Sequence, residues 1–176
     1  MKEVNQEKLK LIKLLILDVD GVLTNGKILY NDRGEEIKAF DVKDGHGLKL
    51  LMRSGTEVAL ITGRKSKVVL HRARDLGIKQ VYQRVTKKIE VYEKILRGKK
   101  LEDKHVGFIG DDLVDIPVLR RVGFSATVWD AIPEVKAVFD YVASRKGGDG
   151  AVREICELLL KVQNKWEEIT ARYQKN

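Results

Sequence analysis

The segment LLILDVDGVLTNG, residues 14–26, is a run of large aliphatic residues that ends in two aspartates, Asp18 and Asp20. A short apolar run of this kind predicts a buried strand, which we place at residues 13–18. Burying an unpaired carboxylate is costly, so two aspartates at the end of a buried strand must be solvated or paired. We therefore expect a cation at this end of the strand.

Apolar segments alternate with amphipathic segments along the rest of the chain. Further strands are expected at residues 56–61, 79–82, 105–109, 124–128 and 139–143. Helices are expected at about 45–54, 65–76, 86–97 and 113–121, with a short helix from Pro133 and a long C-terminal helix and tail over 149–173. The alternation predicts an α/β fold, a Rossmann-like three-layer parallel sheet with helices on both faces.

Residues 27–40 depart from this alternation. The segment KILYNDRGEEIKAF contains two short alternating stretches on either side of residues 31–34, which predicts a β-hairpin inserted just after the acidic pair. No interdomain linker is evident, and 176 residues suit one hydrophobic core. We expect residues 1–176 to form a single domain.

The composition argues against several classes of function. The net charge is +8, but the cations are spread along helices and loops without helix-turn-helix or zinc-finger spacing, so an anionic small molecule fits better than nucleic acid. No apolar run approaches the ~20 residues that span a bilayer, and the N-terminus lacks the features of a signal peptide. We expect a cytoplasmic protein with no membrane partner, in which the lone Cys156 is a packed hydrophobic residue.

Polar residues follow several of the expected strands, at the sheet edge where such folds bind ligands. Asp18 and Asp20 follow the first strand and the Thr62-Gly63-Arg64 segment follows the second. The third and fourth strands are followed by Lys87, Lys88, Gly110, Asp111, Asp112 and Asp115. Carboxylates and a lysine around one opening would hold Mg²⁺ and a phosphoryl group, because Mg²⁺ prefers carboxylate and phosphate oxygens.

Each motif alone also has an ordinary explanation. Two aspartates after a strand are often part of a solvated turn, Thr62 suits a helix N-cap, and Gly110-Asp111-Asp112 suits a loop. Their common order across an α/β alternation favours a shared site.

The motifs resemble those of a known superfamily. DVDGVLT (residues 18–24) matches the D-x-D-G-x-[LV]-[ST] signature of the haloacid-dehalogenase superfamily of phosphatases, and ITGR, a following lysine and GDDLVD resemble its other motifs in order. More narrowly, the chain resembles phosphatases of 3-deoxy-D-manno-octulosonate 8-phosphate over nearly its whole length, in the segments 37–51, 57–69, 110–123 and 147–160. That resemblance implies a role in lipopolysaccharide biosynthesis.

The resemblance also implies a mechanism. Asp18 would attack phosphorus to form an aspartyl-phosphate, and Asp20 would protonate the departing sugar oxygen and later take a proton from water. Mg²⁺ would be held by the Asp18 carboxylate, the Asp20 backbone carbonyl and Asp111.

The other motif residues receive supporting roles by the same resemblance. Thr62 and the Gly63 amide would bind phosphoryl oxygens, and Lys88 would balance their charge. Asp112 and Asp115 would orient metal-bound waters and Lys88. The choice of Lys88 over Lys87 keeps the family's spacing, although this chain has Arg84 where the family has a glycine.

The sequence leaves no room for a cap domain, so the active site would be open to water unless another subunit covers it. In similar proteins a homotetramer gathers the hairpins at its centre. The resemblance implies substrate contacts in the segment 41–45 and at three further cationic residues. These residues are Asp41, Val42, Lys43, Asp44 and Gly45, together with Lys49, Arg64 and Arg72. For the sugar carboxylate we expect Arg64 first and Arg72 second, because a guanidinium binds a carboxylate with two hydrogen bonds.

The terminal helix carries an apolar stripe, at Val152, Ile155, Leu159, Val162, Trp166, Ile169 and Tyr173. This stripe suits packing on its own domain as well as an intersubunit role. The resemblance implies that the last stretch, WEEITARYQKN, would reach a neighbouring site, as tails in this family do. Two other functions stay open: a phosphatase of a nine-carbon ulosonate phosphate, and a non-catalytic phosphosugar-binding subunit.

Overall fold

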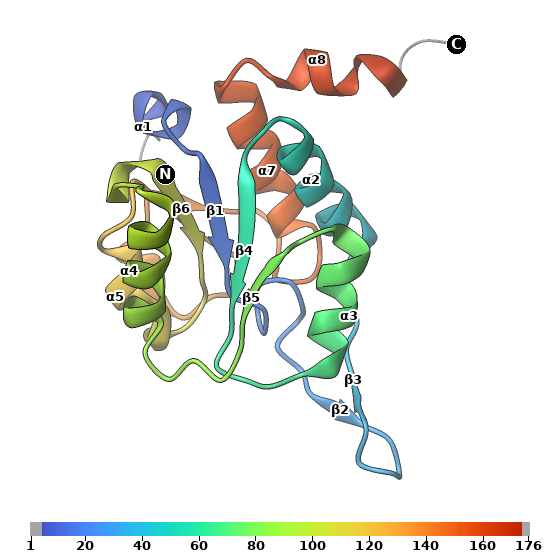
Figure 1. Cartoon of the computed structure of the whole chain (residues 1–176). Coiled ribbons are helices and arrows are strands. Elements are labelled where there is room, and N and C mark those ends of the chain that lie inside the picture. Colours follow the sequence, from blue (N-terminus) through green and yellow to red (C-terminus); the bar gives the residue numbers. More distant parts are fainter. Residues whose placement is uncertain (1–4, 174–176) are drawn as a thin grey trace.

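A single parallel sheet forms the centre of the computed structural model, which describes residues 5–173 (Figure 1). Its strands are β1 (Leu14–Leu17), β4 (Glu57–Ile61), β5 (Gln80–Tyr82), β6 (Val106–Ile109), β7 (Phe124–Thr127) and β8 (Tyr141–Val142). They lie in the order β5-β4-β1-β6-β7-β8 and every pairing is parallel. The four residues of β1 are all fully buried, which confirms the strand predicted from LLIL.

Helices cover both faces of the sheet (Figure 1). One face carries α2 (Val42–Arg53), α3 (Lys67–Leu76) and α7 (Ala151–Val162), and the other carries α4 (Lys88–Lys99) and α5 (Ile116–Leu119). The shorter elements are α1 (Gln6–Lys10), α6 (Pro133–Lys136), α8 (Trp166–Thr170), and the 3₁₀ turns η1 (Asp103–His105), η2 (Leu113–Asp115) and η3 (Ala171–Tyr173). The predicted three-layer α/β fold is confirmed, and no helix within residues 5–173 is both long and apolar enough to cross a membrane.

The inserted hairpin is present at the predicted position. Its strands β2 (Leu29–Tyr30) and β3 (Glu36–Ile37) pair antiparallel. At the turn, the Asn31 side chain accepts hydrogen bonds from the amides of Arg33 and Glu35 at 3.0 and 2.9 Å. The hairpin extends away from the sheet, below the carboxyl ends of the strands in Figure 1.

The C-terminal helix is not continuous, so the prediction of one long helix was wrong. It ends at Val162, and the chain turns through Asn164, which has a φ of +56°. The Gln163 side chain donates to the backbone oxygens of Leu9 and Ile12 at 3.0 and 2.9 Å, which ties the helix end to the N-terminal segment. The left-handed turn is tolerated because asparagine adopts this conformation at low cost.

The apolar stripe of this segment packs on its own domain. Val152, Ile155 and Leu159 are fully buried, as is Cys156. Beyond the turn, the Tyr173 hydroxyl accepts a hydrogen bond from Arg53 on α2 at 2.8 Å. The last three residues of WEEITARYQKN lie outside the described range, and the predicted reach of this stretch to a neighbouring site stays a prediction.

Candidate active site

Asp18 lies directly beyond β1, beside a buried lysine. The Asp18 amide donates to the Ile109 oxygen at 2.9 Å, which extends the pairing of β1 and β6 by one residue. The Lys88 Nζ atom lies 2.8 Å from Asp18 Oδ1 and 2.6 Å from Asp115 Oδ1. Although burial disfavours the charged form of Lys88, the two carboxylates raise its pKa above the ordinary value. Lys88 is therefore an ammonium group held between two carboxylates.

Asp115 organises the loop that follows β6. Its Oδ2 atom accepts hydrogen bonds from the amides of Asp111 and Asp112 at 3.1 and 3.3 Å. Gly110 is required here, since a Cβ at this position would lie 2.5 Å from the Asp115 carboxyl carbon. Asp112 is exposed and its Oδ1 accepts from the Leu113 amide at 2.7 Å, so it caps η2 and does not contact Lys88. Of the two residues expected to orient Lys88, only Asp115 touches it.

Three carboxylates gather at this point. Oxygens of Asp18, Asp111 and Asp115 lie within 4.8 Å of one another. Burial, with the charges of Asp18 and Asp115, raises the pKa of Asp111 to about 8. Burial and Asp115 likewise raise the pKa of Asp18 to about 6, against the opposing effect of Lys88. One ammonium does not balance three carboxylates, of which two are buried and Asp111 is partly buried, and this leaves room for a further positive charge.

The residues present fit a divalent cation. Asp111 Oδ1 is buried and has no hydrogen-bond partner among residues 5–173. Gly21, with a φ of +95°, approaches so closely that a Cβ there would lie 2.0 Å from Asp111 Oδ2. Because both Asp115 oxygens already accept hydrogen bonds, Asp18 and Asp111 are the carboxylates left to hold a metal, and oxygen ligands suit Mg²⁺.

Asp20 contacts a different lysine, Lys38, at the base of the hairpin. Asp20 Oδ1 forms an ion pair with Lys38 Nζ, and the Arg64 Nε atom lies 3.9 Å from Asp20 Oδ2. A lysine therefore pairs with each of the two aspartates, Lys88 with Asp18 and Lys38 with Asp20. Lys38 was not among the predicted site residues, because one lysine in an alternating strand carries no sequence signal of burial.

The loop after β4 brings Thr62, Gly63 and Arg64 to the same edge of the sheet. Thr62 is buried, and its Oγ1 accepts from the Arg64 amide at 3.3 Å. Thr62 does not cap α3, since that N-cap is Ser66, whose hydroxyl accepts from the Val69 amide at 3.3 Å. The ordinary explanation of Thr62 as a helix cap was therefore wrong.

The neighbouring loop after β5 contains a strained residue. Arg84 has a φ of +57°, the left-handed conformation that glycine adopts without cost. Its amide donates to the Arg64 oxygen at 3.3 Å, and the Val85 amide donates to the Thr62 oxygen at 3.2 Å. These bonds hold the two loops together. Lys87 is exposed and pairs with Glu90 at 3.1 Å, so Lys88 alone of the two lysines enters the cluster.

Comparisons with known proteins agree with this geometry. The family model of haloacid dehalogenase-like hydrolases matches residues 78–155. The chain is 47% identical over 157 residues to the 3-deoxy-D-manno-octulosonate 8-phosphate phosphatase KdsC of Escherichia coli K12, covering 89% of this chain and 84% of that one. The KdsC of Yersinia pestis is 46% identical over 90% of this chain and 85% of its own. The chain belongs to the 3-deoxy-D-manno-octulosonate 8-phosphate phosphatase family.

A crystal structure from this family gives the same fold. The phosphatase of Moraxella catarrhalis, in complex with a magnesium ion, a phosphate ion and a KDO molecule, matches with a TM-score of 0.94 at 43% identity, over 96% of this chain and 97% of that one. The resemblance first noted in four segments is thereby confirmed.

The family's expected substrate residues fall into two groups. Asp44 is buried, and its carboxylate accepts from the Arg153 amide at 2.7 Å and the Gly150 amide at 3.3 Å, so it faces the start of α7. Arg72 donates to the Asp41 oxygen at 3.0 Å, and a Cβ at Gly45 would lie 2.3 Å from its guanidinium. These side chains hold α2 against its neighbours.

The other expected residues are open to solvent or only partly buried. Val42 is 79% exposed, Lys43 is exposed and Lys49 is half-buried. Asp41 is the N-cap of α2, with its carboxylate accepting from the Lys43 and Asp44 amides at 2.6 and 2.9 Å. Arg64 pairs with Glu36 at 3.1 Å. Lys43 and Lys49 make no ion pair within residues 5–173, and they are the most available cations of this group.

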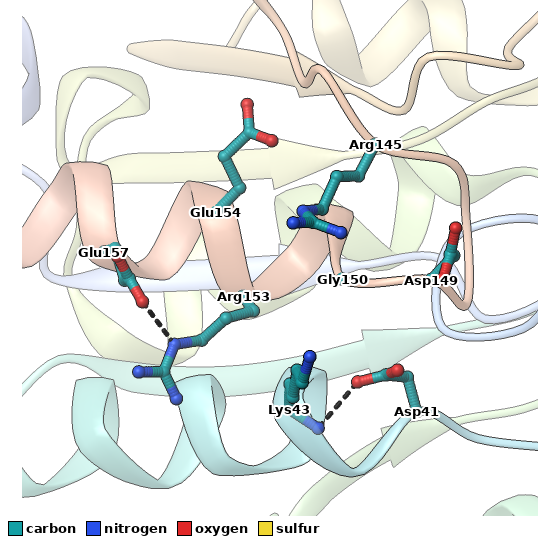
Figure 2. A pocket seen from close by; sticks show the side chains of 8 residues that line it. All are labelled: Asp41, Lys43, Arg145, Asp149, Gly150, Arg153, Glu154 and Glu157. Atoms are coloured by element: carbon teal, nitrogen blue, oxygen red, sulfur yellow. Dashed lines mark hydrogen bonds and ion pairs between the residues drawn. The ribbon is translucent and has the colours of Figure 1, made fainter.

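A pocket of about 470 Å³ lies beside these residues (Figure 2). The starts of α2 and α7 and the loop before α7 line it, through Asp41, Lys43, Arg145, Asp149, Gly150, Arg153, Glu154 and Glu157. Figure 2 shows Lys43 and Arg145 on facing walls. Neither Arg145 nor Arg153 was among the predicted site residues. Arg145 lies outside the segments that carry the resemblance, and Arg153 lies in the segment 147–160 but had no role assigned to it. The pocket is separate from the Asp18 cluster.

Proposed function

We propose that this chain hydrolyses 3-deoxy-D-manno-octulosonate 8-phosphate to the free sugar acid and phosphate, in the cytoplasm, as a step of lipopolysaccharide biosynthesis. The observation that carries the proposal is the position of Asp18, held by Lys88 beside the carboxylates of Asp111 and Asp115. The named relatives act on this phosphate ester, and the motif residues of this chain occupy one edge of the sheet.

The reaction proceeds in two balanced steps. An Asp18 carboxylate oxygen attacks phosphorus as the bond from phosphorus to the sugar oxygen breaks, and Asp20 gives its proton to that oxygen. Asp20 then takes a proton from a water molecule whose oxygen attacks phosphorus. The aspartyl bond breaks, which regenerates Asp18 and releases phosphate.

The remaining residues lower the electrostatic cost of these steps. Lys88 holds Asp18 in place and balances the phosphoryl charge, and the Thr62 hydroxyl and Gly63 amide donate to phosphoryl oxygens. Asp18, the Asp20 carbonyl and Asp111 would hold Mg²⁺, which screens the negatively charged nucleophile from the phosphate. Asp115 keeps Lys88 oriented, through the 2.6 Å contact described above.

Substrate binding uses the cations at the rim. Arg64 is the proposed partner of the sugar carboxylate, and it would exchange its contact with Glu36 for that group. Lys43 and Lys49, which have no ion pair among the described residues, supply further positive charge. Arg72 is left with a supporting role because its guanidinium already binds the Asp41 backbone.

The chain would assemble as a homotetramer through its hairpin. Leu29, Tyr30 and Ile37 are 52%, 61% and 50% exposed, although they lie on a two-stranded element that is marginally stable alone. Exposed apolar groups on such an element favour burial against another chain. Light scattering should give the mass of four chains, and Leu29→Asp should lower it; a wild-type monomer would refute this part of the proposal.

The activity is tested by phosphate release with Mg²⁺. The eight-carbon acid phosphate should be hydrolysed fastest, with a nine-carbon ulosonate phosphate and simple sugar phosphates as comparison substrates. Asp18→Asn and a chelator should each abolish release, while Asp75→Asn, a change at an exposed aspartate of α3, should not. Equal rates on all substrates would keep the mechanism and remove the assigned substrate. No release from any substrate would indicate a binding subunit.

A further inference from the structure

Lys38 is buried without a role in the mechanism described so far. It and Lys88 are the two buried lysines of residues 5–173, and the Lys38 side chain is fully inaccessible to solvent. Lys38 follows β3 of the hairpin, an element that contributes little to the core. A buried ammonium is costly unless it is paired, so the structure around it must supply negative charge.

Four charged side chains form a closed network at this point. Lys38 Nζ pairs with Asp20 Oδ1 and lies 3.2 Å from Glu36 Oε1. The same Glu36 oxygen lies 3.1 Å from Arg64 Nη2, and Arg64 Nε lies 3.9 Å from Asp20 Oδ2. Glu36 and Lys38 share one face of the hairpin because side chains two residues apart point the same way along a strand. Two cations and two anions balance within the network.

The two oxygens of Asp20 are in different environments. Lys38 binds Oδ1 directly, whereas Oδ2 accepts no hydrogen bond within the described residues. Arg64 Nε lies 3.9 Å from Oδ2 and has no hydrogen-bond partner in the same range. Oδ2 is therefore the oxygen left to exchange a proton.

We propose that Lys38 is a positioning residue that fixes the Asp20 carboxyl group, with Oδ2 directed at the sugar oxygen that leaves. The inference rests on the proposed function, in which Asp20 is the general acid and base. In the first step the Oδ2 proton passes to the sugar oxygen as its bond to phosphorus breaks. In the second, Oδ2 takes a proton from the attacking water. Without Lys38, Asp20 rotates among its rotamers and is less often within reach of either proton.

The leaving group separates this role from a structural one. A sugar alcohol needs a proton to depart, whereas the phenol of p-nitrophenyl phosphate leaves as an anion. Lys38→Met should lower kcat for the sugar phosphate by about 10- to 100-fold, which is less than the full ~10²–10⁴-fold contribution of general acid catalysis because Asp20 is still present. The KM should change less than about 3-fold. The second step is the same for both substrates, so with p-nitrophenyl phosphate the rate to compare is that of p-nitrophenol release in a single turnover, which should fall less than about 3-fold. The matched control is Lys27→Met, an exposed lysine of the same hairpin, which should change neither rate.

A double-mutant cycle with Asp20→Ala provides the second measurement. Because Lys38 acts through Asp20, Lys38→Met should have no further effect on kcat in the Asp20→Ala background. If Lys38→Met does not fold, as judged by thermal unfolding, Lys38→Gln takes its place in both experiments. Equal losses in the single-turnover rate of leaving-group release from both substrates, or full additivity with Asp20→Ala, would overturn the inference.

The failure of the proposed function gives a different pattern. If Asp20→Ala slows leaving-group release from the two substrates equally in a single turnover, the general-acid role of Asp20 is wrong and the inference falls with it. If Asp20→Ala slows the sugar phosphate selectively and Lys38→Met does not, only the role of Lys38 is wrong.

Discussion

Asp44 makes the stability of this fold depend on pH in a direction opposite to that of a surface aspartate in a salt bridge. The side chain is 1% exposed and contacts the first turn of α7. Burial raises its pKa to about 6, with a contribution from the nearby charges of Asp41 and Asp149, against the hydrogen bonds from the Arg153 and Gly150 amides. Its ordinary value is 3.8.

The difference of about two pKa units corresponds to about 3 kcal/mol of folding free energy. Because the folded-state pKa is the higher one, this stabilisation is fully present below about pH 4. It is lost as the pH rises through about 6. Asp44→Asn carries no titrating group, so the wild type should lose up to about 3 kcal/mol relative to this variant between pH 4 and pH 7.

Urea unfolding of the two proteins from pH 4 to pH 7.5 measures this difference, since the other titrating groups are common to both. For a chain of this size, about 3 kcal/mol corresponds to roughly 6–12 °C in Tm. Asp149→Asn should make the pH-dependent loss smaller, because it removes a negative neighbour of Asp44. A difference that stays constant with pH, or grows in favour of the wild type as the pH rises, would refute the reasoning, and would mean that the two amides outweigh burial.

Two further predictions concern backbone positions near the site. Arg84→Gly should stabilise the fold by about 0.5–1 kcal/mol, because it removes the strain of the left-handed backbone at φ +57°. In a thermal unfolding scan this corresponds to a rise of roughly 1–4 °C in Tm, and a lower Tm would contradict the prediction. Gly21→Ala should destabilise by about 1–3 kcal/mol and weaken the Mg²⁺-dependent rise in Tm, since its Cβ would lie 2.0 Å from Asp111 Oδ2. Gly26→Ala is the control, because Gly26 also has a positive φ but a Cβ there would lie no closer than 3.7 Å to any atom. Equal effects of Gly21→Ala and Gly26→Ala would contradict the role of the Asp111 contact.

Most of the fold followed from local pattern. Buried strands such as β1 carry continuous apolar runs, and the hairpin carries its own turn residues, so both were predicted at their observed positions. The break after Val162 was missed because the apolar stripe continues through it at helical spacing. The reason for the break lies in the contacts of Gln163 with Leu9 and Ile12, which are distant in sequence.

The candidate site was predictable to the extent that motifs mark it. Asp18, Lys88 and Asp111 lie together as predicted, because each belongs to a motif beyond the carboxyl end of a strand, β1, β5 or β6. Asp44 and Arg72 were expected at the substrate, which stays a prediction, and their contacts between helices were not foreseen. Lys38 was not predicted as a site residue, because it is buried only when the base of the hairpin folds onto Asp20, and the sequence does not show that contact. Charge and residue type do not reveal which partner a side chain meets across the fold.

The central place of β1 has a consequence during protein synthesis. Leu14 pairs with Glu57 on one side and with Val106 on the other. The ribosome therefore adds Val106, the first residue of β6, 92 positions after Leu14. At about 5–20 residues per second, translation takes roughly 5 to 20 seconds to reach it. Throughout that interval the LLIL strand has an open edge on every nascent chain. An unpaired apolar edge of this kind invites pairing with another chain, so aggregation on crowded polysomes should depend on how quickly the ribosome reaches β6.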